Sequence, residues 1–67
     1  MFEHKKAGDT VTRLLAGVAP MTLVVSRVDA EFIYCGNWIF RRDTGGEVDF
    51  DLGWDGVRVT GSVLQPE

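Results

Sequence analysis

The sequence contains few of the residues that hold very small domains together through cross-links. It has one cysteine, Cys35, and one histidine, His4, in 67 residues. A single cysteine forms no internal disulfide, and no spacing of Cys and His matches that of a zinc site. We therefore expect no disulfide, no metal and no cofactor, which excludes a disulfide-stapled secreted scaffold.

Long hydrophobic runs are also absent. The most apolar stretch, residues 14–25, is interrupted by Gly17 and Pro20 and is shorter than the roughly 20 residues that cross a bilayer. Residues 1–6 are rich in charge and are not followed by the apolar segment of a signal peptide. These features predict a cytoplasmic protein with no membrane-spanning segment.

Catalytic motifs are missing as well. Neither the G-x-G-x-x-G nor the G-x-x-x-x-G-K type of phosphate-binding loop occurs. Cys35 has no base, cation or helix N-terminus nearby in the sequence to activate its thiol, and Ser26 and Ser62 lack a base too. We therefore expect Cys35 to be a buried strand cysteine and the protein not to be an enzyme.

Positive charge is scarce. Seven Lys and Arg stand against ten Asp and Glu, which gives a net charge of -3 and a pI near 4.9. Only Arg41 and Arg42 form a basic pair on a predicted strand, whereas small nucleic-acid-binding domains cluster their basic residues. The charge pattern argues against nucleic acid as a partner.

What is present is the composition of one small folded domain. Hydrophobic residues make up 45% and charged residues 25% of the chain, close to the average of globular proteins. A chain of this length has room for a single core. We expect a flexible leader over residues 1–8, one β domain over residues 9–64 and a tail over residues 65–67.

The first half of the chain favours strands. Residues 10–15 begin with three β-branched residues, which favours a strand over a short helix capped by Asp9 and ended by Gly17. Residues 21–28 are the most β-prone segment and carry apolar side chains on both sides, which suits a small barrel or an interface. A turn at residues 28–31 is predicted to pair this strand with residues 32–35 as a hairpin.

The middle of the chain contains two glycine signals. Gly36-Asn37 fits either a two-residue type II′ hairpin or a bulge inside one strand. We favour the bulge, because a bent strand would carry residues 38–40 onward to the turn predicted at residues 43–46.

Strict alternation marks the last predicted hairpin. Residues 47–54 alternate polar and apolar, and Asp55-Gly56 is a type I′ turn pair that would link them to a strand over residues 57–64. This register places Val48 opposite Val63 and puts three carboxylates, those of Glu47, Asp49 and Asp51, on the other face. We interpret this acidic face mainly as a solvated surface, with a docking surface for a basic partner and a weak cation site as alternatives. Together the segments predict an all-β fold of about five short antiparallel strands in a meander, forming an SH3-like small barrel or a curled sheet.

Several short motifs resemble those of a family of very short bacterial proteins, the YodC-like proteins. They are Gly8-Asp9-Thr10-Val11, Pro20-Met21-Thr22-Leu23-Val24, and Cys35 followed by Trp38, with a looser likeness at residues 44–47 and 52–54. The family keeps one residue between Cys and Trp, where this chain has two. The resemblance implies a small SH3-like β fold and supplies no catalytic residue.

Aromatic residues are numerous for so short a chain, and a small core does not bury them all. We expect a protein-interaction surface that includes aromatic and basic side chains, namely Trp38, Phe40, Trp54, Arg41, Arg42 and Arg58. The leading hypothesis is a non-catalytic barrel that pairs with itself, as a homodimer or higher assembly, or with another protein. The alternative is a barrel that binds a ligand or nucleic acid by stacking on Trp38 or Trp54.

Overall fold

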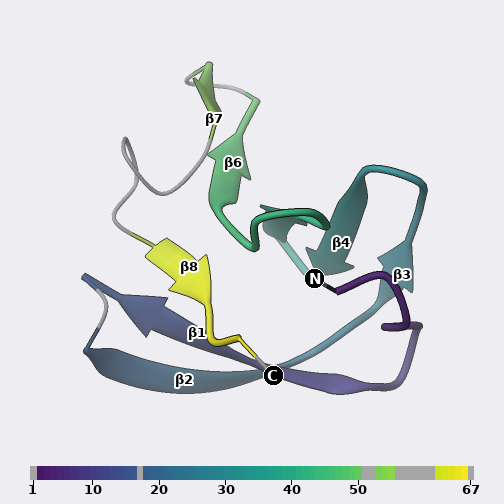
Figure 1. Ribbon diagram of the computed structural model, residues 1–67, viewed down its shortest axis with the longest axis horizontal. Coiled ribbons are helices and arrows are strands. Elements are labelled where there is room, and N and C mark those ends of the chain that lie inside the picture. The colour runs from purple at the N-terminus through teal and green to yellow at the C-terminus, as the bar shows by residue number, and fades with distance from the viewer. Residues whose placement is uncertain (1, 17, 51–52, 56–61, 67) are drawn as a thin grey trace.

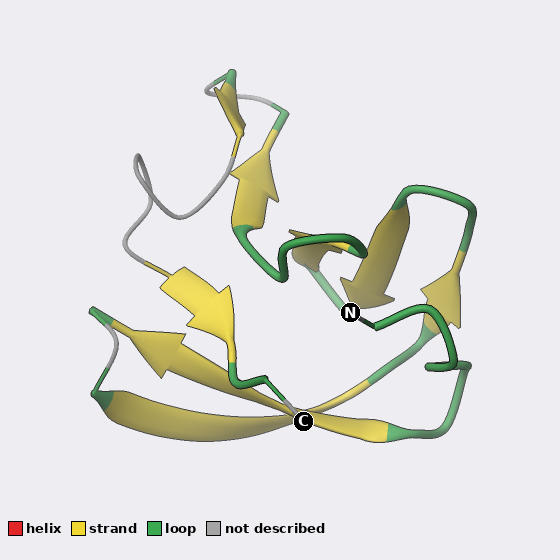
Figure 2. Ribbon diagram, viewed as in Figure 1, coloured by secondary structure: helices red, strands yellow, loops and turns green. Residues whose placement is uncertain are grey.

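The computed structural model describes residues 2–16, 18–50, 53–55 and 62–66, and all regular structure in them is β (Figure 2). None of the described residues forms a helix that is long and apolar enough to cross a membrane. The strands are β1 (Thr10–Leu15), β2 (Ala19–Val24), β3 (Arg27–Val28), β4 (Phe32–Cys35), β5 (Trp38–Arg41), β6 (Glu47–Asp49), β7 (Trp54–Asp55) and β8 (Ser62–Leu64). The predicted all-β class is confirmed.

The strands form two antiparallel sheets that curl around a common core (Figure 1). One sheet has the order β2-β1-β8, and the other follows the chain as β3-β4-β5-β6-β7. A bridge between Gly46 and Val63 links the start of the β6 region to β8. The fold is therefore a small curled β structure in which the chain passes from the first sheet to the second and returns.

The hairpin of β1 and β2 confirms that residues 10–15 form a strand rather than a helix. Its register pairs Val11 with Leu23 and Arg13 with Met21. Val11 is buried and Leu23 packs against the core, so this alternating set faces inward. Because successive strand residues point to opposite faces, Thr22 and Val24 face outward.

The prediction of one strand over residues 21–28 is wrong. β2 ends at Val24 and β3 begins at Arg27, in the other sheet. The Val25 N–H donates to the Asp9 carbonyl, and the Ser26 N–H donates to the Tyr34 carbonyl, so consecutive residues bond to different sheets. The apolar residues on both sides of the segment reflect this change of sheet, and only β3 forms the predicted hairpin with β4.

The Gly36-Asn37 pair forms a hairpin turn, not the favoured bulge. Cys35 pairs with Trp38, which leaves the two residues as the whole loop. Gly36 has φ +64°, and a type II′ turn requires a positive φ at its first central position. The turn predicted at residues 43–46 is confirmed, since the Arg41 N–H donates to the Gly46 carbonyl and the Gly45 N–H to the Arg41 carbonyl.

The single strand predicted over residues 47–54 is also wrong. β6 ends at Asp49, and β7 folds back so that Asp49 pairs with Trp54 and Val48 with Asp55. Gly53 has φ +74° and supplies the reversal just before β7, so the chain turns earlier than Asp55-Gly56. β8 pairs with β1, and Val63 bridges to Gly46 instead of Val48. The rest of the predicted turn and strand, residues 56–61, lies outside the described residues.

Phe2 belongs to the core, although it lies in the segment expected to be a leader. Its side chain is fully buried, and its N–H donates to the Arg42 carbonyl. The buried side chains packed together with it come from both sheets and are Val11, Val25, Ile33, Cys35, Phe40 and Leu64. The first residues of the chain therefore close the core between the sheets.

Candidate functional site

A polar cluster centred on Arg13 connects the two sheets. Arg13 follows Val11 by two residues on the inner face of β1, so its side chain points between the sheets. Its Nε donates to Glu47 Oε1 on β6, at 3.3 Å, and to Ser62 Oγ on β8, at 2.8 Å. The guanidinium carbon lies 5.3 Å from the centre of the Trp38 ring on β5, within the range of a cation–π contact.

The Arg13 cluster is largely shielded from water. The side chains of Arg13 and Glu47 keep 14% and 17% of their surface exposed, and Ser62 is buried. An ion pair in such a setting is worth little unless further hydrogen bonds satisfy it, which Ser62 provides here. The arrangement fixes the distance between the sheets and holds Trp38 in place.

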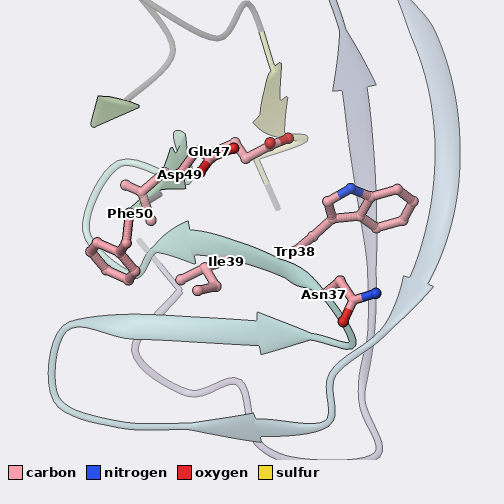
Figure 3. A pocket seen from close by; sticks show the side chains of 7 residues that line it. Asn37, Trp38, Ile39, Glu47, Asp49 and Phe50 are labelled. Atoms are coloured by element: carbon pink, nitrogen blue, oxygen red, sulfur yellow. The ribbon is translucent and has the colours of Figure 1, made fainter. Parts of the chain in front are cut away.

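A cleft of about 380 Å³ lies beside this cluster (Figure 3). The β5–β6 ladder pairs Phe40 with Glu47 and Ile39 with Val48, and it does not continue to Trp38 and Asp49. The two strands therefore part, and the cleft opens between them. Its lining consists of Asn37, Trp38, Ile39, Glu47, Val48, Asp49 and Phe50.

The cleft combines aromatic and acidic side chains. Figure 3 shows Trp38 and Phe50 toward opposite ends with Ile39 between them, and Glu47 and Asp49 on β6. Its lining contains no basic side chain and two carboxylates, of which that of Glu47 is paired with Arg13. By charge it suits a cationic group rather than a phosphate.

The structure brings together some of the residues expected at a binding surface and separates others. Trp38, Glu47 and Asp49 meet at the cleft. Phe40 is fully buried in the core. Arg41 donates from Nε to Asp43 Oδ1 at 3.0 Å, and this bond is the main reason why the pKa of Asp43 lies below its ordinary value.

Arg42 serves the fold of the N-terminal segment. Its guanidinium donates to the carbonyls of Asp29, at 2.6 Å, and of Phe2 and Lys5, each at 3.4 Å, and also to that of Glu3. Neither Arg41 nor Arg42 lines the Trp38 cleft. Trp54 lies on β7, whereas Arg58 and Asp51 lie outside the described residues.

Further aromatic contacts involve Phe32 and Tyr34, which alternate along β4 with the buried Ile33 and Cys35 and so lie on the opposite face. The Arg27 guanidinium carbon lies 3.8 Å from the centre of the Tyr34 ring, and the Tyr34 hydroxyl donates to Asp29 Oδ2 at 2.8 Å. That bond is the main cause of a raised pKa of Tyr34. Phe50 meets Phe32 edge to face, with ring centres 5.3 Å apart, and remains 60% exposed.

Cys35 is buried on β4, as predicted. Burial raises the pKa of its thiol, which keeps the thiol protonated and unreactive. The described part of the chain contains no group of three His, Cys, Asp or Glu side chains able to hold a metal ion. The structure supplies neither an activated nucleophile nor a metal centre in that part.

Exposed apolar side chains gather on the β1–β2 hairpin. Leu15 is 45% exposed, Val18 79%, Met21 42% and Val24 60%. Val18 lies in the loop between the two strands, and Met21 and Val24 lie on β2. The hairpin therefore presents most of the large apolar surface that the described residues leave open to solvent.

Arg13 is the functional residue that sequence reasoning missed. A signal was present, since Arg13 stands between Val11 and Leu15 at strand spacing and so occupies a position that alternation assigns to the inner face. A charged residue at such a position needs a buried partner. The partners, Glu47 and Ser62, are distant in the sequence, so the ion pair and the hydrogen bond of Arg13 could not be predicted from neighbouring residues.

Comparisons with protein-family models, with curated proteins and with solved structures found no match. The resemblance of the short motifs to the YodC-like proteins therefore stays a prediction. A function for this chain has to rest on the chemistry of its exposed hairpin, its Arg13 cluster and its cleft.

Proposed function

We propose that this chain is a non-catalytic, SH3-like small barrel that acts as a protein-interaction module in the cytoplasm and associates with itself. The observation that carries the proposal is the exposed apolar surface of the β1–β2 hairpin, formed by Leu15, Val18, Met21 and Val24. Fully burying one aliphatic side chain of this size stabilises a contact by about 1.5–3 kcal/mol. Leu15 and Met21 lie on one face of the hairpin, Val24 lies on the other, and Val18 lies in the loop. This much exposed apolar surface on one hairpin of a small protein is typical of an interface.

Self-association also suits the size of the chain. A core of this kind leaves little net stability once chain entropy is subtracted, and small domains often gain the remainder from oligomerisation. The net charge of -3 keeps the rest of the surface soluble and disfavours unspecific contact.

Molar mass in solution tests the proposal. Size exclusion with light scattering, run from low micromolar to millimolar protein, is expected to show a species of at least twice the 7.4 kDa of one chain. Replacement of Met21 by Ser should shift the equilibrium toward the monomer, whereas Ala30→Ser, at an exposed turn of the other sheet, should leave it unchanged. A strict monomer throughout that range contradicts self-association.

The cleft beside Trp38 favours a second candidate function, binding of a small ligand. Its aromatic side chains and the carboxylate of Asp49 match a cationic ligand, whereas the carboxylate of Glu47 is already paired with Arg13. An arginine amide and its neutral citrulline counterpart, added to Trp54→Phe protein, give the test. We expect only the arginine amide to change Trp38 fluorescence, and Asp49→Asn to weaken the change; equal responses to both compounds contradict a cation site.

A further inference from the structure

β2 is an open edge of the three-stranded sheet. The sheet order is β2-β1-β8, so among the described strands β2 has a neighbour on one side only, and in Figure 1 it runs along the outside of the molecule. Its six residues, Ala19–Val24, include no charged side chain, and all but Leu23 are exposed. An edge strand with these properties is a template for pairing with another strand.

The other strand edges that the structure describes are short or already engaged. β3 and β7 have two residues each. β8 has three residues, and its Leu64 N–H donates to the Gly45 carbonyl while Val63 bridges to Gly46. Proteins usually protect edges with charges, bulges or short strands, and β2 has none of these apart from Pro20 near its start.

The backbone of β2 presents unpaired groups at regular spacing. Next to β2, Val25 donates to the Asp9 carbonyl and accepts from the Gly8 N–H, which sets the alternation of the ladder. In an antiparallel ladder, residues two apart direct their main-chain groups to the same side, so the N–H and C=O groups of Leu23 and the corresponding groups of Met21 point toward β1. Thr22 and Val24 direct N–H and C=O to the open side, and no other main-chain group of the described residues bonds to them there.

We infer that two copies of the chain pair through their β2 strands, antiparallel and about a two-fold axis at Leu23, so that Thr22 of each copy lies opposite Val24 of the other. This inference rests on the proposed self-association and names its contact. In this register each outward N–H and C=O of Thr22 and Val24 meets a partner group, and the exposed Val24 side chain of each copy lies beside Thr22 of the other. The two sheets of the order β2-β1-β8 become one continuous sheet.

The self-pairing places no like charges against each other. The chain carries a net charge of -3, so most faces of two copies repel weakly, whereas β2 is neutral along its whole length. Pro20, which has no N–H, stands on the open side of the strand outside the Thr22–Val24 pairs, where the missing donor removes no bond from this register. An identical strand is therefore a complementary occupant of this edge.

Two edge variants and one control test the inference by sedimentation equilibrium. Thr22→Pro removes an outward N–H from both copies, and Val24→Lys brings a charge to the contact. Each is expected to raise the dissociation constant by about 100-fold or more. The control Thr10→Lys adds the same charge on the same face, opposite Val24 but one strand away from the edge, and should leave the constant within a few-fold of the wild type.

The outcomes separate the two levels of the proposal. A wild-type monomer overturns both self-association and the β2 contact. A wild-type dimer that persists in Thr22→Pro and Val24→Lys overturns the β2 contact alone, as does equal weakening by Thr10→Lys. Circular dichroism of each variant shows whether the β structure is retained, and Val24→Lys decides the question if Thr22→Pro does not fold.

Discussion

Arg13 is the residue on which the connection between the two sheets depends. It bonds to Glu47 and Ser62 through one nitrogen and lies over Trp38, so four strands meet at one side chain. Because the cluster is largely shielded from water, loss of the cation leaves the Glu47 carboxylate mostly buried without its partner. Side chains that are individually polar thus act as part of the core.

We expect Arg13→Met to lower the free energy of unfolding by about 2 kcal/mol, because removal of one member of a shielded pair costs more than the pair contributes. Urea denaturation gives the value. Arg41→Met is the matched control, since the Arg41–Asp43 pair is more exposed, with 35% and 62% of the side-chain surfaces open. Equal losses for the two variants would contradict a structural role of the Arg13 cluster.

Gly45 is the glycine whose replacement should harm the fold most clearly. Its φ is +79°, and a Cβ atom would lie 2.7 Å from Cε2 of Phe2. Gly45→Ala therefore combines a backbone cost of about 1–2 kcal/mol with a clash in the core.

Gly36→Ala is the matched control in thermal unfolding. Gly36 has φ +64° but open space around the added Cβ, so only the backbone cost applies. We expect Gly45→Ala to lower the melting temperature more than Gly36→Ala does, and Phe2→Leu to relieve part of the Gly45→Ala effect. Additive effects of Phe2→Leu and Gly45→Ala would contradict the close packing of these two residues.

At the scale of elements, the turn between β3 and β4 illustrates how a local signal fixes structure. Asp29 Oδ1 accepts from the N–H groups of Glu31, at 2.9 Å, and of Phe32, at 2.7 Å, while Oδ2 accepts from the Tyr34 hydroxyl. The backbone N–H of Glu31 is the largest of the causes that hold the pKa of Asp29 below its ordinary value of 3.8. The carboxylate form is therefore favoured by the folded state.

This shift predicts a loss of stability in acid. A pKa that is lower in the folded state stabilises the fold above the ordinary value of 3.8, and the stabilisation disappears as pH falls through the lower folded pKa. Asp29→Asn removes this titration, so its melting temperature should depend less on pH below about 4 than that of the wild type. Glu31→Gln, at an exposed neighbour in the same turn, is the control; identical acid profiles of Asp29→Asn and the wild type would contradict the assignment.

Elements with local signals could be predicted from the sequence, and those that depend on distant pairing could not. The β-branched residues of β1, the Asp29 turn and the glycines at residues 43–46 act within a few residues, and all three were predicted correctly. The split of residues 21–28 depends on bonds from Val25 to Asp9 and from Ser26 to Tyr34. The early end of β6 depends likewise on its pairing with β7.

The candidate site shows the same division. Alternation correctly places Glu47 and Asp49 on one face of β6. Both side chains line the cleft from that strand. Alternation does not say which face is inward, and Glu47 turns toward Arg13 instead of toward solvent. Arg13 belongs to a strand that pairs with both ends of the domain, so its partners became evident only with the three-dimensional arrangement.

For the whole molecule, the central feature is an imbalance between its two sheets. The five-stranded sheet has short edges, whereas the three-stranded sheet leaves a six-residue neutral edge and an apolar hairpin exposed. A second copy that adds its own β2 covers this edge and extends the smaller sheet.

Amide hydrogen exchange along β2, measured by NMR on dilute and on concentrated protein, tests this claim most directly. In the single chain the Thr22 and Val24 amides face solvent and the Leu23 amide faces β1. We predict that concentration slows exchange at Thr22 and Val24 while it changes Leu23 much less. Fast exchange at Thr22 and Val24 under both conditions, in protein that light scattering shows to be dimeric, would contradict pairing through β2.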